Sequence, residues 1–72
     1  MLNNSVYDLM ETAAVISKGL YRYPQFEEDA HDCQSCQQIW QQMKQADEQQ
    51  LEKIVRHLKE HLQQEERATR AA

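Results

Sequence analysis

Apolar side chains recur at helical spacing along a stretch of 34 residues, from Cys33 to Glu66, that contains neither glycine nor proline. Glutamine, glutamate, lysine and leucine, all good helix formers, dominate this stretch. The pattern predicts one continuous helix, which at 1.5 Å per residue is roughly 50 Å long. The large apolar positions on its predicted face are Ile39, Trp40, Met43, Leu51, Ile54, Val55, Leu58 and Leu62.

A second apolar stripe precedes this stretch and predicts a shorter helix over residues 5–22. Ser5 and Asp8 fit the capping box that satisfies free N–H groups at the start of a helix. In an alternative start, Asn3 is the cap, and Leu2 packs on Tyr7 as a hydrophobic staple. The apolar positions of the shorter helix are Val6, Leu9, Met10, Ala13, Ile16 and Leu20.

Pro24 marks the boundary between the two predicted helices. A proline disfavours the helical conformation for the residue before it, here Tyr23, yet it suits the first turn of a following helix. Gly19 or residues 21–23 are therefore expected to form the one sharp reversal of the chain. The second helix is predicted over residues 24–66, either straight or kinked at residues 31–33, with residues 67–72 as a frayed tail.

The predicted fold is all-α, a single domain over residues 1–72 that forms an antiparallel helical hairpin with a long second helix. A first helix of about 27 Å covers the second helix only to about residues 45–50. Five apolar residues beyond that point are expected to lack a partner in the same chain: Leu51, Ile54, Val55, Leu58 and Leu62. Because soluble monomers rarely expose such a patch, we expect the hairpins to assemble into a four-helix bundle, as a homodimer or higher homo-oligomer.

Composition and charge narrow the classes of partner. The 72 residues carry a net charge of −4, and the eight lysines and arginines form no basic face of the kind that nucleic-acid binding needs. The sequence has no apolar run of membrane-spanning length and no signal-peptide pattern. We therefore expect a cytoplasmic protein that binds neither nucleic acid nor membranes. No catalytic signature stands out, and no enzymatic activity is expected.

Cys33 and Cys36 have the C-x-x-C spacing of redox and zinc sites. Thiols near a helix N-terminus have lowered pKa values, but a thioredoxin-type site needs a preceding strand, and none is predicted. With His31 the two thiols supply three zinc ligands, one fewer than a structural zinc site has. The alternative is that both cysteines are small, half-buried residues in the contact between the helices.

His57 and His61 lie four residues apart, so their imidazoles are expected one above the other on one helix face. Beside Glu60, this pair is half of a metal site if a symmetric partner supplies the remaining ligands. The alternative is a strip of solvent-facing side chains.

Asp47 and Gln50 interrupt the apolar stripe between Met43 and Leu51. Polar groups at such positions need hydrogen-bond partners, and Glu11, midway along the first helix, is one expected neighbour. Alternatively, polar residues in an apolar stripe fix the register of associating helices.

The segment from Trp40 to Ile54, WQQMKQADEQQLEKI, resembles the second helix of a ferritin/rubrerythrin-like hairpin. Helices of that family carry Glu-x-x-His inside a similar apolar frame and bind a di-iron pair together with a glutamate from the first helix. The resemblance extends over residues 5–62.

The positions that match the family motif are Asp47-x-x-Gln50 or Glu48-x-x-Leu51, and neither pair contains histidine. The resemblance implies a carboxylate site for iron or another divalent metal. The ligands it implies are Glu11, Asp47 and Glu48.

The sequence as a whole favours a small self-associating helical protein with a structural or protein-interaction role and no cofactor. A ferritin-like carboxylate protein that binds iron or another divalent metal is the alternative.

Overall fold

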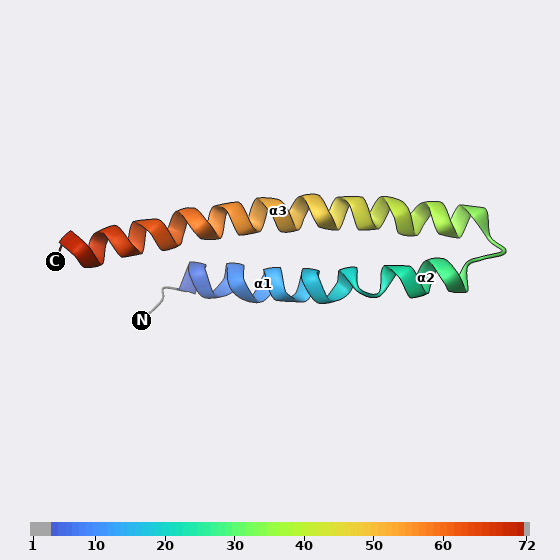
Figure 1. The fold of residues 1–72 in the computed structure, drawn as a ribbon, viewed down its shortest axis with the longest axis horizontal. Coiled ribbons are helices and arrows are strands. Elements are labelled where there is room, and N and C mark those ends of the chain that lie inside the picture. Colours follow the sequence, from blue (N-terminus) through green and yellow to red (C-terminus); the bar gives the residue numbers. More distant parts are fainter. Residues whose placement is uncertain (1–3, 72) are drawn as a thin grey trace.

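The computed structural model describes the backbone of residues 4–71 and the side chains of residues 4–67. Three helices make up this part of the chain: α1 (Asn4–Leu20), α2 (Tyr23–Asp29) and α3 (Gln34–Ala71). In Figure 1, α1 and α2 follow one another along one line, and α3 returns antiparallel beside both. The described residues contain no strand, and the prediction of an all-α helical hairpin with a long second helix is confirmed.

The chain reverses between α2 and α3, at residues 30–33, and the prediction of a reversal at Gly19 or residues 21–23 is wrong. The Ala30 N–H donates to the Phe26 carbonyl at 3.1 Å, and the backbone then leaves the helix at φ −95°, ψ 23°. The Cys33 N–H donates to the Ala30 carbonyl at 2.9 Å, and the Cys33 carbonyl accepts from Gln37 at 3.1 Å. These bonds close a turn that contains neither glycine nor proline.

Pro24 interrupts the first arm of the hairpin without reversing it. Its ring nitrogen has no hydrogen to donate to the Leu20 carbonyl, so the α-helix breaks there. Arg22 nevertheless keeps helical dihedral angles of φ −84° and ψ −25°, and its N–H donates to the Gly19 carbonyl at 3.0 Å. Because the backbone stays close to helical through the break, α2 continues in the direction of α1 (Figure 1).

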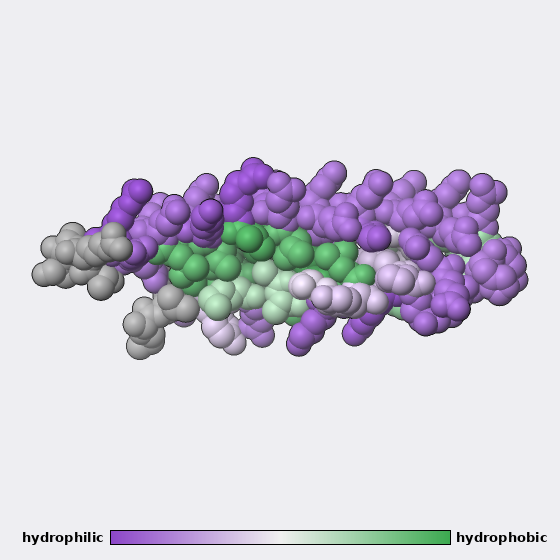
Figure 2. Space-filling view, viewed as in Figure 1, coloured by the Kyte–Doolittle hydropathy of each residue, from purple (hydrophilic) through white to green (hydrophobic). Residues whose placement is uncertain are grey.

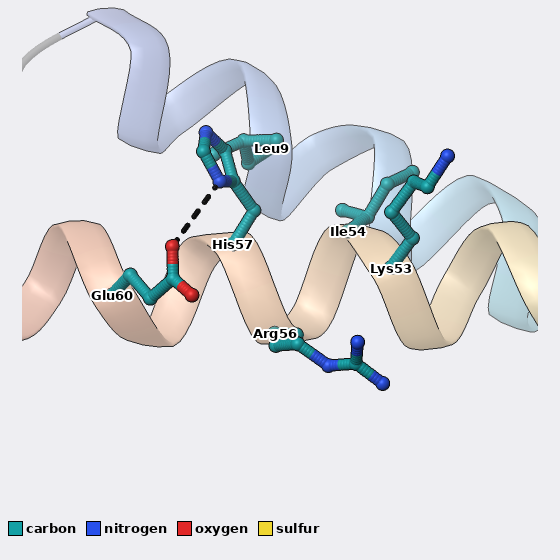
Figure 3. A pocket seen from close by; sticks show the side chains of 6 residues that line it. All are labelled: Leu9, Lys53, Ile54, Arg56, His57 and Glu60. Carbon is teal, nitrogen blue, oxygen red and sulfur yellow. Dashed lines mark ion pairs between the residues drawn. The ribbon is translucent and has the colours of Figure 1, made fainter.

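The later reversal lengthens the arm that packs against α3. Leu9 of α1 lies beside Ile54 and His57 of α3 (Figure 3), so α1 reaches the segment that the sequence predicted to be uncovered. Leu51, Ile54 and Leu58 are accordingly half-buried. The prediction that they lack a partner in the same chain is wrong, because the arm facing α3 contains α2 as well as α1.

Val55 and Leu62 are the members of that predicted set that α1 leaves open. Val55 is 48% exposed and Leu62 is 40% exposed. The apolar surface of the hairpin therefore lies along one edge of the contact between α1 and α3, rather than on an uncovered end of α3.

The helix ends also differ from the predicted ones. α1 begins at Asn4, so Ser5 lies inside its first turn, and the alternative cap, Asn3 with its staple residue Leu2, lies outside the described residues. α3 begins at Gln34 instead of residue 24, because the turn precedes it. Its backbone stays helical to Ala71, so the predicted tail is helical as far as the structure describes it, and Ala72 lies outside the described residues.

The hairpin is a single layer of helices. Its Cα atoms span 60 × 16 × 13 Å, with a radius of gyration of 17.0 Å. A compact domain of this length has a radius of gyration of about 11 Å. The accessible surface is 6024 Å², whereas a compact protein of the same mass exposes about 4,700 Å². No helix in the described part of the chain combines the length and apolarity that a membrane span requires.

Three of the described residues are buried: Val6 in α1, Tyr23 in α2 and Ala30 at the turn. Around Tyr23, three aromatic rings join α2 to the first part of α3. The ring centroids of Phe26 and Trp40 lie 4.9 Å apart, and that of Tyr23 lies 6.0 Å from Phe26 and 6.4 Å from Trp40. Such pairs contribute roughly 0.5–1.5 kcal/mol each beyond their buried area. This aromatic cluster stabilises the packing of α2 on α3 at the turn end of the hairpin.

Candidate functional site

Apolar side chains remain on the surface along the contact between α1 and α3. Figure 2 shows this hydrophobic surface on one face of the hairpin, in the half away from the turn. The spacings from Leu51 to Val55, Leu58 and Leu62 are four, three and four residues in turn, so the four side chains form one stripe on α3. Within residues 4–67, the large apolar side chains that are at least 40% exposed are Tyr7, Met10, Val15, Tyr21, Ile39, Met43, Val55 and Leu62.

The same face includes one flank of α1. Met10 is 45% exposed and Tyr7 is 60% exposed, and these two residues, with Ala14, recur at helical spacing. We use the term apolar seam for the combined surface. Its residues are Tyr7, Met10, Ala14, Leu51, Val55, Leu58 and Leu62.

The opposite edge of the contact holds a shallow cleft of about 400 Å³ (Figure 3). Leu9 and Ile54 form its apolar floor, and charged side chains line its rim. The rings of His57 and His61 meet edge to face with their centroids 4.8 Å apart, which confirms that they share one face of the helix. His57 Nδ1 lies 3.5 Å from the Glu60 carboxylate, and both side chains are well exposed.

Asp47 is half-buried and accepts a hydrogen bond from the hydroxyl of Tyr23, across the contact between α2 and α3. The pKa of Tyr23 is raised, first by this hydrogen bond, then by burial of the ring and by the negative charge of Asp47. The sequence did not identify Tyr23 as the partner, because it placed the reversal at that residue. Once the turn is at residues 30–33, α2 faces the middle of α3.

The remaining predicted metal ligands are not gathered around Asp47. Glu11 lines an open depression on the outer side of α1 with Asp8, Thr12 and Val15, so the prediction that it partners Asp47 is wrong. Glu48 and Gln50 are exposed on α3 in the hairpin, and of the two polar residues in the stripe only Asp47 is half-buried. Among the described residues, no group of three or more His, Cys, Asp or Glu side chains is placed to hold a metal ion.

Cys33 and Cys36 are half-buried at the turn, and their sulfur atoms lie 2.7 Å apart in a hydrogen-bond contact. Cys33 is the residue that precedes α3, and its Sγ accepts from the Cys36 N–H at 3.4 Å in the manner of a helix cap. The Ser35 hydroxyl lies 3.4 Å from the same sulfur. His31 Nδ1 lies 3.3 Å from the Glu28 carbonyl oxygen.

These contacts make the two thiols unequal. The pKa of Cys33 is lowered, mainly by the hydrogen bond with Cys36 and further by the Ser35 hydroxyl and the Cys36 N–H, against the opposing effects of burial and Asp32. The pKa of Cys36 is raised, first by the same sulfur contact and then by burial and nearby negative charge. These contacts therefore favour the thiolate at Cys33 over that at Cys36.

No protein-family model matches this chain, and comparisons with curated proteins and with solved structures found no match either.

Proposed function

We propose that this protein is a self-associating helical module, in which two hairpins pack across a two-fold axis through the apolar seam and form a four-helix bundle. The observation that carries the proposal is the exposed apolar surface of the seam, with Met10, Val55 and Leu62 each at least 40% exposed. The proposed role is structural, because the bundle joins two copies of the chain.

The surface area of the chain supports a second copy as the occupant of the seam. The hairpin exposes about 1,300 Å² more than a compact protein of its mass. Stable homodimers bury roughly 1,000 Å² or more per subunit and have more apolar interfaces than transient complexes. Packing two hairpins face to face converts two single layers into two stacked layers and removes surface of this order.

The charges beside the stripe on α3 are self-complementary. Glu52 and Lys59 are seven residues apart and lie on the same side of α3, next to Val55. When two α3 helices run antiparallel about an axis near Val55, Glu52 of each copy faces Lys59 of the other. Glu52 also binds Arg56 of its own helix at 2.8 Å, which holds the carboxylate beside the stripe.

The same axis gives complementary shapes on α1. Leu9 lies beside Ile54 and His57, so Met10 is level with Val55 and close to the proposed axis. About that axis, Tyr7 of each copy faces the small side chain of Ala14 of the other. Large and small residues that alternate in this way across an interface allow it to pack without voids.

The test compares three proteins by size-exclusion chromatography with light scattering at micromolar concentration. The native chain is expected at twice 8.6 kDa. Val55→Glu places a charge in the centre of the seam and is expected to give a monomer, because a buried unpaired charge is strongly unfavourable. Val15→Glu is the matched control: Val15 is 64% exposed on the outer side of α1, and its variant should remain a dimer.

Two results would contradict the proposal. One is a native chain that elutes as a folded 8.6 kDa monomer. The other is a Val55→Glu variant that keeps the native mass, since the seam then cannot be the surface that associates. Val55 is preferred to Leu58 for this test because Leu58 is half-buried, so a charge there could also unfold the hairpin.

A further inference from the structure

We propose that Cys33 and Cys36 form a dithiol–disulfide exchange site, whose substrates are organic disulfides with neutral or cationic surroundings. The two sulfur atoms are 2.7 Å apart at the start of a helix of 38 residues. An S–S bond is about 2.05 Å long, so a small movement of two side chains closes the pair. This site lies at the turn, away from the apolar seam, and the inference does not depend on self-association.

Cys33 has the surroundings of an attacking thiolate. It occupies the capping position of α3, where the positive end of the helix dipole favours a negative charge. The Cys36 N–H and the Ser35 hydroxyl both lie 3.4 Å from its sulfur, and the second thiol lies closer still. The exposed side of the turn leaves the sulfur accessible to a substrate, since both cysteines are only half-buried.

The exchange proceeds in two balanced steps. The Cys33 thiolate attacks one sulfur of a disulfide R–S–S–R, which forms a mixed disulfide and releases RS⁻, which takes up a proton from water. Cys36 then loses its proton and attacks Cys33 Sγ, which forms the Cys33–Cys36 disulfide and releases the second RS⁻. The two thiols of the chain are oxidised by two electrons in total, and the substrate disulfide is reduced to two thiols.

A cleft of about 250 Å³ beside the thiols sets the class of substrate. Phe26, Ala30 and Trp40 give it an apolar wall that suits the carbon chain next to a disulfide. Asp29 and Asp32 line the same cleft, and their carboxylates attract cations and repel anions. Cystamine, which carries two ammonium groups, is therefore expected to be a better substrate than oxidised glutathione, which is an anion.

The first experiment traps the intermediate by mass spectrometry after acid quench. With cystamine, Cys36→Ser should accumulate one cysteamine adduct at Cys33, while the native chain should lose two hydrogens and keep no adduct. Cys33→Ser should react at least about tenfold more slowly at neutral pH, because the Cys36 N–H and the Ser35 hydroxyl contact the sulfur of Cys33, which this variant lacks. Equal rates for the two serine variants, or a native chain that carries two adducts, would overturn the proposal.

The second experiment tests the role of charge, with the fluorescence of Trp40, the only tryptophan and a wall of the cleft, as the readout of oxidation. The ratio of the rates with cystamine and with oxidised glutathione is measured at low and high salt. Asp32→Asn should lower this ratio several-fold at about 10 mM salt, and the effect should fade at about 0.5 M, where screening is strong. Glu60→Gln removes the same charge far from the turn and should leave the ratio unchanged. A ratio that Asp32→Asn does not alter would overturn the assigned substrate class.

Discussion

The two ends of the hairpin are held together by different kinds of contact. At the turn end, the rings of Tyr23, Phe26 and Trp40 pack on one another, and the Tyr23 hydroxyl binds Asp47. At the open end, Val6 is fully buried, but the stripe on α3 that contains Val55 stays partly in water. The turn end therefore has a packed aromatic cluster and a hydrogen bond within one chain, whereas the open end leaves the apolar seam exposed.

The free energy of unfolding of the proposed dimer therefore has two parts, one from contacts within a chain and one from contacts between copies. Contacts within one chain contribute the same free energy at every protein concentration. Contacts with a second copy contribute more as the concentration rises, so the Tm of an associating protein increases with concentration. Variants at the turn end should lower Tm without changing its dependence on concentration, and variants of the seam should flatten that dependence.

The largest effect is expected from Trp40→Ala, which removes the centre of the aromatic cluster. Truncation of a packed tryptophan costs about 3–5 kcal/mol, and the half-buried position of Trp40 favours the lower value. Urea denaturation should show a loss of about 3 kcal/mol. The slope of Tm against the logarithm of concentration should stay native. A loss that appears only in dilute samples would show that the turn end also depends on the second copy.

Tyr23→Phe tests the hydrogen bond to Asp47 and should cost about 1–2 kcal/mol at pH 8. The pKa of Tyr23 is higher in the folded chain than the ordinary value of 10, so its contribution is complete below pH 10 and is lost as the pH rises through the folded value. The difference between the native chain and the variant should therefore shrink above pH 10.

The matched control is Tyr21→Phe, because Tyr21 is 84% exposed. Urea denaturation of the native chain and both variants at pH 8 and pH 11, with a reductant present, makes the comparison. A Tyr23→Phe variant that matches Tyr21→Phe at pH 8 would show that the hydrogen bond to Asp47 does not stabilise the hairpin.

Exchanging the charges of Glu52 and Lys59 tests the register of the two α3 helices in the proposed dimer. Lys59→Glu places like charges opposite Glu52 of the second copy, twice per dimer by symmetry. Exposed ion pairs contribute about 0.2–1 kcal/mol each, so the dimer should dissociate roughly fivefold more readily. The double variant Glu52→Lys with Lys59→Glu should return the Kd, measured by analytical ultracentrifugation, to near the native value. Losses that simply add in the double variant would exclude the antiparallel contact about Val55.

The smallest effect is a stabilisation at Gly19→Ala, in the last turns of α1. Gly19 has no positive φ, and a Cβ built there meets nothing within 4 Å. Alanine restricts the unfolded chain and suits a helix, so a gain of about 0.5–1 kcal/mol is expected in urea denaturation. Ala13→Gly, on the inner side of the same helix, should show a loss. Destabilisation by Gly19→Ala would contradict the structure, because it would mean that an added Cβ clashes with a neighbouring atom.

The helices could be predicted from the sequence because helical periodicity is a local property. The position of the turn could not, because Pro24 removes only one hydrogen bond and the chain stays helical around it. The true turn is closed by backbone bonds around Ala30 and by the packing of Phe26 on Trp40, which lie far apart in the sequence. Neither feature requires a glycine or a proline, so the sequence of the turn does not reveal it.

The candidate sites likewise divide into contacts that depend on local spacing, which could be predicted, and contacts that depend on the position of the turn, which could not. The contacts of His57 with His61 and of Cys33 with Cys36 depend only on spacings of four and three residues, which the sequence shows directly. The partner of Asp47 depends on the register of the two arms, and the register depends on where the turn lies. Moving the turn by about eight residues replaced the predicted Glu11 with Tyr23 and partly covered Leu51, Ile54 and Leu58, which had been expected to lack a partner.

Sedimentation equilibrium of the native chain, with circular dichroism of the same samples, tests directly whether the open end of the hairpin depends on a second copy. The expected result is a species of twice 8.6 kDa at high concentration, which dissociates on dilution and loses helical signal as it does so. A monomer of 8.6 kDa that keeps its full helical signal at every concentration would contradict it, because the open end would then be stable with its apolar seam in water.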